Sequence, residues 1–287
     1  MYYLLLIFLY PIAALPLRML YVLSDVICFF LYNVFRYRKD IVIDNLRNAF
    51  PDKSEKEIRI ICNKFYHNFC DQWVEMLKLL TISEKQLNKR FKGNWDLLET
   101  LRVQGKNTYV FLGHTFNWEW ANVASQFNIH QQMAGVYLPI ESAAFDRFVL
   151  KLRRRANGMM ISMKARKDAF AALNKTQHVL GLIADQNPSN LNNVLWVNFM
   201  HRKAPFFVGS AHMARKGNAA VVLSTIKKIK RGYYQLDMEC LCNGAEAMEA
   251  EAIITAYVKH LERQVMEQPE NYMWTHRRWK HSDTMVQ

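Results

Sequence analysis

Glycine, proline and cysteine are all scarce in this chain of 287 residues. Ten glycines and seven prolines are too few for a long disordered segment, and an apolar share of 51% is typical of a folded protein. The five cysteines are an odd number without the spacing of a disulfide framework, which indicates a reducing compartment. Cys240 and Cys242 have no partners at metal-ligand spacing, so we expect them to pack in the fold and predict no metal site.

Motifs of nucleotide and nucleic-acid chemistry are missing as well. The chain has no glycine-rich phosphate loop, which argues against a nucleotide-dependent reaction. It has no aromatic ribonucleoprotein motif or zinc finger, which argues against a nucleic-acid partner. Acidic residues are in deficit, with 25 against 38 basic ones and a net charge of +13, so we expect an acidic partner. Anionic lipid and an acidic carrier protein are the partners that remain.

Charged residues are almost absent from the start of the chain, which is its most hydrophobic part. We interpret residues 1–35 as a membrane anchor and residues 36–287 as the domain that follows it. A cleaved signal peptide is disfavoured because no basic region precedes the apolar run. Four residues interrupt the run, so a kinked span, a shallow hairpin and an interfacial helix all remain open: Pro11, Pro16, Arg18 and Asp25. The basic residues Arg36, Arg38 and Lys39 predict a cytoplasmic location for the domain.

The rest of the chain alternates short apolar runs with amphipathic segments. This pattern predicts an α/β fold with a central mixed sheet flanked by helices. Ser54 to Glu57 form a capping box that opens a helix running to about Leu80. We predict strands at 108–112, 132–138, 177–184, 219–226 and 233–241. Further helices are expected at 143–152, 206–215 and 245–268, with a short link at 199–205.

The stretch 107–119 gives the first indication of chemistry. Residues 108–112 are rich in β-branched and aromatic side chains and predict a buried strand. Gly113 permits a tight turn, and Asn117 is suited to cap the helix that follows. His114 then lies on a strand-to-helix loop.

His114 precedes Glu119 by five residues. A carboxylate can hold an imidazole in one tautomer while the other ring nitrogen takes a proton from a hydroxyl, so the two side chains could form a base for a substrate hydroxyl. Taken alone, the spacing favours a plainer interpretation, in which His114 caps a turn and Glu119 faces solvent. The other motifs must decide between the two.

Two further groups of polar residues suit such a site. Arg153, Arg154 and Arg155 precede Gly158 and could make forked contacts to phosphate or carboxylate, or could instead form a solvated helix end. Asp185 follows the strand predicted at 177–184, either as a plain turn residue or as a functional one. Functional groups collect at the carboxyl ends of strands in open α/β sheets, where His114 is also expected.

Several blocks of residues now resemble one family when taken in order: 45–51, 113–119, the arginines before Gly158, 184–186 and 272–280. They resemble the bacterial lipid A biosynthesis acyltransferases, in particular the late or secondary ones. The resemblance covers essentially the whole chain. The His-x4-Glu spacing is shared with glycerolipid acyltransferases generally, whereas the ordered set, above all the C-terminal block Tyr-Met-Trp-Thr-His-Arg-Arg-Trp-Lys, is specific.

The resemblance implies a glycerolipid-acyltransferase-like fold and an enzyme of the bacterial inner membrane that faces the cytoplasm. It implies transfer of a fatty acyl chain from acyl carrier protein or coenzyme A to a hydroxyl of a lipid A precursor, an anionic glycolipid, without a cofactor. The family roles fall on His114 as base and Glu119 as its partner. Substrate-binding roles fall on Asp185, on Asn117 and on the arginine block, where Arg154 and above all Arg155 are favoured.

This chemistry has simple requirements. A thioester is already activated, so the enzyme needs a base, donors for the developing oxyanion and an apolar slot for the chain. We expect the oxyanion donors among the arginines and the backbone amides near Gly113. Two alternatives remain: the same mechanism with a lysophospholipid or amino-acid lipid as acceptor, and a non-enzymatic basic membrane protein that binds anionic lipid or nucleic acid.

Overall fold

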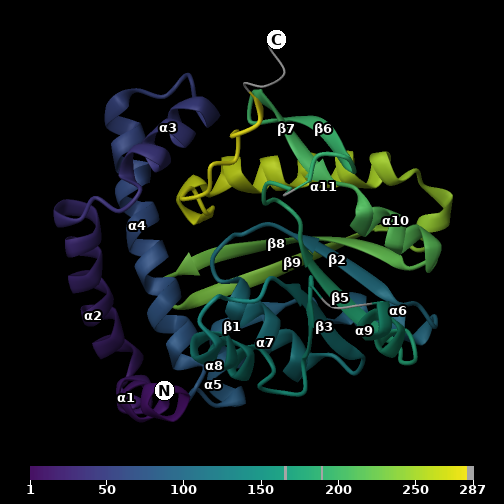
Figure 1. Ribbon diagram of the computed structural model, residues 1–287, viewed down its shortest axis with the longest axis horizontal. Helices are drawn as coiled ribbons and strands as arrows, with labels where there is room; N and C mark the ends of the chain where they lie inside the picture. Colours follow the sequence, from purple (N-terminus) through teal and green to yellow (C-terminus); the bar gives the residue numbers. More distant parts are fainter. Residues whose placement is uncertain (165–166, 189, 283–287) are drawn as a thin grey trace.

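The computed structural model describes residues 1–164, 167–188 and 190–282. A seven-stranded sheet forms its centre, in the order β1-β9-β8-β2-β5-β3-β4 (Figure 1). β8 and β9 pair antiparallel and the other neighbouring strands pair parallel, which confirms the predicted mixed sheet. The strands are β1 Phe91–Gly93, β2 Thr108–Leu112, β3 Gln132–Tyr137, β4 Met159–Ser162, β5 His178–Ile183, β8 Ala220–Lys230 and β9 Tyr233–Cys242.

Helices cover both faces of this sheet, as predicted (Figure 1). One face carries α9 (Lys167–Leu173), α10 (Gly209–Lys216), α11 (Ala250–Glu267) and a hairpin of β6 (Val194–Phe199) and β7 (Arg202–Phe207). The other carries α5 (Glu84–Arg90), α6 (Asp96–Val103), α7 (Trp118–Asn128) and α8 (Ala143–Arg153). α3 (Lys39–Ala49) packs on α4 (Glu55–Lys78), which contributes side chains to both layers.

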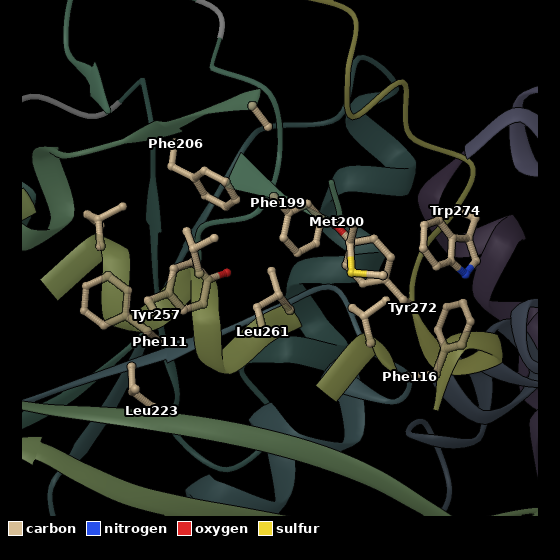
Figure 2. Close-up of a cluster of buried hydrophobic side chains, with 14 of the residues drawn as sticks. Phe111, Phe116, Phe199, Met200, Phe206, Leu223, Tyr257, Leu261, Tyr272 and Trp274 are labelled. Atoms are coloured by element: carbon tan, nitrogen blue, oxygen red, sulfur yellow. The ribbon is translucent and has the colours of Figure 1, made fainter. Parts of the chain in front are cut away.

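The alternation of side chains along β2 divides the core between the two layers. Phe111 belongs to the cluster on the α11 face, whereas Val110 belongs to the cluster on the α7 face. Figure 2 shows the first cluster, in which aromatic rings surround Phe111. They come from α11, from the hairpin and from the C-terminal segment, residues 268–282: Tyr257, Phe199, Phe206 and Tyr272. The C-terminal segment is therefore part of the core.

Two predicted helix starts are confirmed in detail. Ser54 accepts a hydrogen bond from the Glu57 amide while the Glu57 carboxylate accepts one from the Ser54 amide, so the capping box opens α4 as expected. Asn117 caps α7, because its side-chain oxygen accepts from the Trp120 amide at 3.0 Å.

The hairpin corrects the prediction for 199–215. We predicted a link followed by a helix from Phe206, but Phe206 and Phe207 end β7 and the helix α10 begins at Gly209. Pro205 lies within β7, where it is tolerated because each strand of a two-stranded hairpin has a free edge. A second boundary also moves, since a short 3-10 turn at 245–247 precedes α11.

The N-terminal residues form α1 (Tyr2–Ala14), α2 (Leu17–Phe29) and a π-helical continuation, η1 (Phe30–Val34). By length and composition, the helix Leu17–Val34 could cross a membrane, and 22% of it is buried against the rest of the protein. Apolar side chains on its outer side are exposed, among them Val22 and Val26. One apolar N-terminal helix is thus present, consistent with a membrane anchor.

The inner side of α2 is joined to the domain by polar contacts. The Tyr21 hydroxyl donates to Glu75 at 2.8 Å, and the Ser24 hydroxyl donates to Asp71 at 2.8 Å. Asp25 forms an ion pair with Arg231 at 2.6 Å, and Arg231 also contacts Asp71. α2 is therefore a packed element of the fold along α4 (Figure 1).

Candidate active site

β2 and β5 are neighbours, so the loops that follow them meet at one edge of the sheet. His114 follows β2 and Asp185 follows β5. The backbone amide of His114 donates to Oδ2 of Asp185 at 2.9 Å, and Nδ1 of the imidazole lies 2.6 Å from Oδ1. The two residues predicted at strand ends therefore form a histidine–aspartate pair.

Asp185 sets the tautomer of this imidazole. Burial alone would raise the pKa of Asp185, but the charge that His114 carries when it is protonated, together with hydrogen bonds from its ring and its backbone amide, holds the pKa at about 2, so the carboxylate is ionised at neutral pH. Nδ1 accordingly carries the proton and donates a hydrogen bond to Asp185, which leaves Nε2 as an acceptor. The side-chain amide of Gln186 lies 2.9 Å from Nε2 and donates to it. Nε2 is thus the ring nitrogen without a proton, as a general base requires.

Two rings flank the imidazole and restrict its rotation. The indole of Trp118 meets it edge to face with a centroid distance of 5.2 Å, and His276 stacks on it at 6.0 Å. Burial and the charge of His114 lower the pKa of His276. The imidazole is thereby held in one orientation.

The C-terminal segment fixes the backbone of this loop. Thr115 forms an isolated antiparallel bridge with Tyr272, the amide of Met273 donates to the His114 carbonyl at 3.0 Å, and the amide of Phe116 donates to a carbonyl at residue 271. Asn45 of α3 in turn donates to the carbonyls of Trp274 and His276, at 2.7 and 2.6 Å. Two of the sequence blocks, 45–51 and 272–280, are therefore joined to each other and to the histidine loop.

No hydrogen bond between Glu119 and His114 is present in the described part of the chain, and the predicted role of Glu119 as partner of the imidazole stays a prediction. Among the described residues, the carboxylate of Glu119 instead pairs with the guanidinium of Arg153, with Nη2 2.5 Å and Nε 3.0 Å from its oxygens, and accepts from the Trp118 indole at 3.1 Å. Glu119 lies in the first turn of α7 and Arg153 ends α8, and the packing of these helices brings the two side chains together. Burial opposes the charge of Arg153, but Glu119 outweighs it and raises the pKa of Arg153.

Arg153 is thus the member of the arginine block that lines the cavity, whereas the substrate-binding roles predicted for Arg154 and Arg155 stay predictions. Arg155 donates to the carbonyls of Leu79 and Ile82 after α4 and acts as a structural clamp. Arg154 lies outward, with a hydrogen bond of 3.3 Å to the Met160 carbonyl. The order of these three environments follows from the end of α8, where successive side chains point in different directions.

Asn117 is not among the residues that line the cavity, and its predicted substrate contact stays a prediction. The side chain is completely buried and donates to Glu75 at 2.8 Å while it caps α7. The hydroxyls of Tyr21 and Tyr234 donate to the same carboxyl, each at 2.8 Å. Burial, together with the charge of Asp71, raises the pKa of Glu75 to about 7.

The backbone amides of residues 114–116, next to Gly113, already donate hydrogen bonds within the protein. The amide of His114 donates to Asp185, that of Thr115 to the Gly113 carbonyl, and that of Phe116 to the C-terminal segment. Nη1 of Arg153 makes no hydrogen bond to the described part of the chain, and Arg153 lines the same cavity as His114. Arg153 therefore remains as the expected donor to the oxyanion, and the side-chain amide of Gln186 is a second candidate.

A cavity of about 310 Å³ begins at these groups and extends between α7 and the sheet. Its polar lining includes His114, Glu119, Arg153 and Gln186, and most of the remaining surface is apolar, with residues from α6, α7 and six strands of the sheet. Across 1–164, 167–188 and 190–282, no cluster of three or more His, Cys, Asp or Glu side chains is placed to hold a metal ion. The arrangement suits removal of a proton from a hydroxyl beside an elongated apolar group.

Sequence reasoning missed two groups at this site. Gln186 lay in a block used for the resemblance, but its hydrogen bond to Nε2 depends on the loop after β5. Arg153 was named in its block, but its selection depends on the packing of α8 against α7. Arg278 of the C-terminal block is buried, donates to Asn187 and to a carbonyl of β7, and stacks at 4.1 Å on Phe206, so it supports the loop after Asp185 from behind.

Known proteins match this chain over nearly all of its length. A family model described as bacterial lipid A biosynthesis acyltransferase matches residues 1–281. The lipid A biosynthesis lauroyltransferase of Escherichia coli (strain K12) is 25% identical over 263 residues, which cover 85% of this chain and 79% of the relative. The lipid A biosynthesis palmitoleoyltransferase of the same strain and a lipid A biosynthesis acyltransferase of Shigella flexneri are each 24% identical over 246 residues, with the same coverage.

Proposed function

The chain belongs to the bacterial lipid A biosynthesis acyltransferase family, and from this premise we propose that it transfers a fatty acyl chain from a thioester donor to a hydroxyl of a lipid A precursor. The donor is an acyl chain on acyl carrier protein or coenzyme A. The observation that carries the proposal is the oriented imidazole of His114, with Nε2 free to accept a proton, beside an apolar cavity. The distant relatives are named for lauroyl and palmitoleoyl transfer, so a long acyl chain is the natural donor to test.

The reaction follows from the position of Nε2. The acceptor hydroxyl replaces Gln186 at Nε2 and loses its proton to the imidazole as its oxygen attacks the thioester carbonyl carbon. The new C–O bond gives a tetrahedral intermediate with a negative oxygen. When this collapses, the C–S bond breaks and the leaving thiolate takes the proton from the imidazolium. Asp185 acts on both steps, because its carboxylate stabilises the imidazolium that forms between them.

Arg153 and Glu119 have a positioning and charge-stabilising role in this proposal. The bidentate contact with Glu119 holds the guanidinium in the cavity wall, and the free Nη1 is directed to the tetrahedral oxygen or to a phosphate of the acceptor. The net charge of +13 suits both an anionic glycolipid and an acidic carrier protein. Glu119 thus keeps a place at the site, through Arg153 and not through His114.

We further propose that residues 1–35 anchor the enzyme at the cytoplasmic face of the inner membrane, with residues 36–287 as the acyltransferase domain. α1 and α2 lie along the bilayer surface in this arrangement. If α2 crossed the bilayer, its contacts with Asp71 and Arg231 would bring those charged groups into the hydrocarbon, at high cost. An interfacial helix instead keeps its polar side on the domain and its apolar side in lipid. α1 also contacts α8, where Arg147 stacks at 4.3 Å on Tyr2, so the anchor lies beside the helix that carries Arg153.

Replacement of His114 by alanine, and of Asp185 by asparagine, tests the mechanism. We expect each to lower the rate of acyl transfer in membranes by roughly 10²–10⁴-fold, the usual contribution of a general base. Asp237→Asn is the matched control, because this exposed carboxylate on β9 pairs with Lys227 away from the site. Full activity of a folded His114→Ala variant would refute the role of the imidazole.

The acceptor is tested separately, by mass spectrometry of lipids from a strain that lacks this enzyme. Loss of one acyl chain from lipid A supports the proposed acceptor. Unchanged lipid A with an altered phospholipid or amino-acid lipid would assign the same mechanism to that acceptor instead. Normal lipids together with salt-sensitive lipid binding that ignores His114 would favour a non-enzymatic protein.

A further inference from the structure

The floor of the cavity is formed by three rows of residues that cross the parallel strands. Leu112 and Ile183 are paired next to the histidine loop, at the carboxyl ends of β2 and β5. Two residues further from that edge, Val110, Gly181 and Gly135 lie opposite one another on β2, β5 and β3. All five residues line the cavity, so their side-chain positions share one face of the sheet.

The third row closes the far end. Val179 of β5 is paired with Met133 of β3, and both line the cavity, as does Leu98 of α6. From the level of Ile183 to that of Val179 the strand advances four residues, about 13 Å at roughly 3.3 Å per residue. The cavity thus runs parallel to the strands, with the imidazole at one end and apolar side chains at the other.

The middle row contains two glycines, and the ends of two methionine side chains lie over them. A Cβ atom added to Gly181 would lie 3.1 Å from the terminal methyl of Met133, and one added to Gly135 would lie 3.1 Å from the terminal methyl of Met160. Both neighbours are the flexible ends of methionine side chains, so alanine would fit after a small movement. A branched side chain would extend into the cavity midway along its length.

We propose that Gly135 and Gly181 set the length of the acyl chain that this enzyme transfers. This inference rests on the proposed acyl-transfer function and adds the site of the chain to it. The thioester carbonyl lies at His114, the chain passes over the glycine pair, and its methyl end meets Met133 and Val179. A side chain on either glycine ends the path one row earlier, roughly 7 Å closer to the imidazole for the two residues between rows. The ligand is an unbranched acyl chain that reaches past the middle row.

The test compares thioester donors whose acyl chains range from eight to sixteen carbons. For Gly181→Val, we expect the kcat/KM with long chains to fall relative to that with short chains. The fall should be roughly fourfold for each methylene of the acyl chain that can no longer be buried in the cavity. Gly181→Ala and Gly135→Ala should shift the preference in the same direction by a smaller factor. Met133→Ala should shift it the other way, because it deepens the far end. The matched control is Gly217→Ala at the end of α10, where an added Cβ makes only ordinary contacts and lies outside the cavity.

The outcomes separate this inference from the function on which it rests. If the wild-type protein transfers no acyl group from any donor, the proposed function fails. If the wild type is active but Gly181→Ala, Gly135→Ala and Met133→Ala all keep its chain-length profile, the glycine pair does not set the length and the inference is overturned. Opposite shifts for the glycine and methionine variants, with the Gly217→Ala profile unchanged, support it. The alanine variants keep the test decisive if Gly181→Val does not fold.

Discussion

Arg153 and Arg154 are adjacent in the sequence and have opposite environments. Arg153 makes a bidentate contact with Glu119 in the cavity wall, whereas Arg154 lies outward with a single long hydrogen bond to a backbone carbonyl. A planar guanidinium can make two parallel hydrogen bonds to one carboxylate, and an ammonium cannot. The two positions therefore respond differently to the same conservative substitution.

We expect Arg153→Lys to lower acyl transfer by roughly tenfold or more, since a hydrogen bond to a charged group contributes about 1.5–3 kcal/mol. Arg154→Lys should leave the rate unchanged, and it is the matched control because the change in the side chain is identical. Steady-state rates with a fixed donor and a lipid A precursor measure both. Equal rates for the two variants would remove Arg153 from the site.

The sequence predicted the chemistry of single residues better than their contacts. His114 and Asp185 were predicted at the ends of strands, and parallel strands bring such ends together. The contact between the two residues could therefore be predicted from the sequence. The partner of Glu119 was not, because it depends on the angle at which α7 packs against α8. The family resemblance implied a pairing with His114, whereas the structure pairs Glu119 with Arg153.

At the scale of elements, Glu75 joins four parts of the fold. Its carboxyl group on α4 accepts hydrogen bonds from Tyr21 on α2, Tyr234 on β9 and Asn117 at the start of α7. Burial raises its pKa to about 7, above the ordinary value near 4.3. The folded protein therefore binds a proton that the unfolded chain releases between these two pH values.

This raised pKa gives stability a defined pH dependence. The contribution of a protonated Glu75 is fully present below about pH 4.3 and is lost as the pH rises through 7. We expect the melting temperature of the wild type to fall between pH 5 and 8 relative to Glu75→Gln, by roughly 2–4 °C for each kcal/mol lost. Scanning calorimetry of both proteins across this range is the measurement, and parallel curves would show that Glu75 does not titrate there.

The elements themselves were predictable where one signal dominated. Alternation and β-branched residues gave β2, and a capping box gave the start of α4. The hairpin β6–β7 was missed because Pro205 and the short apolar runs on either side of it suit a link as well as an edge strand. Phe199 and Phe206 stabilise the hairpin, because their rings pack against α11 and the C-terminal segment (Figure 2). Such contacts between residues far apart in the sequence cannot be predicted from the local sequence pattern.

At the scale of the whole molecule, the exposed apolar side of α2 and its polar contacts with the domain bear on the proposed membrane anchor. Val22 and Val26 are 65% and 49% exposed on the side of α2 away from the domain. We expect the double change to glutamate at these positions to move the protein from the membrane to the soluble fraction. Val103→Glu on α6, a residue 72% exposed and remote from the anchor, is the matched control and should stay membrane-bound.

A second measurement distinguishes a surface helix from a spanning one. A reporter that is active only in the periplasm, fused ahead of Met1, should remain inactive if α1 and α2 both lie on the cytoplasmic side. Activity of the reporter would show that α2 crosses the bilayer, and the polar contacts with Glu75 and Asp71 would then have to break in the membrane.

The hydrogen bond from Gln186 to Nε2 of His114 bears on a reaction that the enzyme must avoid. In the proposed reaction, a base left open to solvent would also deprotonate water, which is far more abundant than any lipid, and the thioester would be lost by hydrolysis. With Gln186 seated on the ring nitrogen, the base is occupied until a hydroxyl large enough to displace the amide is bound in the site. The preference for an alcohol over water is then set by the side chain of Gln186, which the acceptor must displace from Nε2.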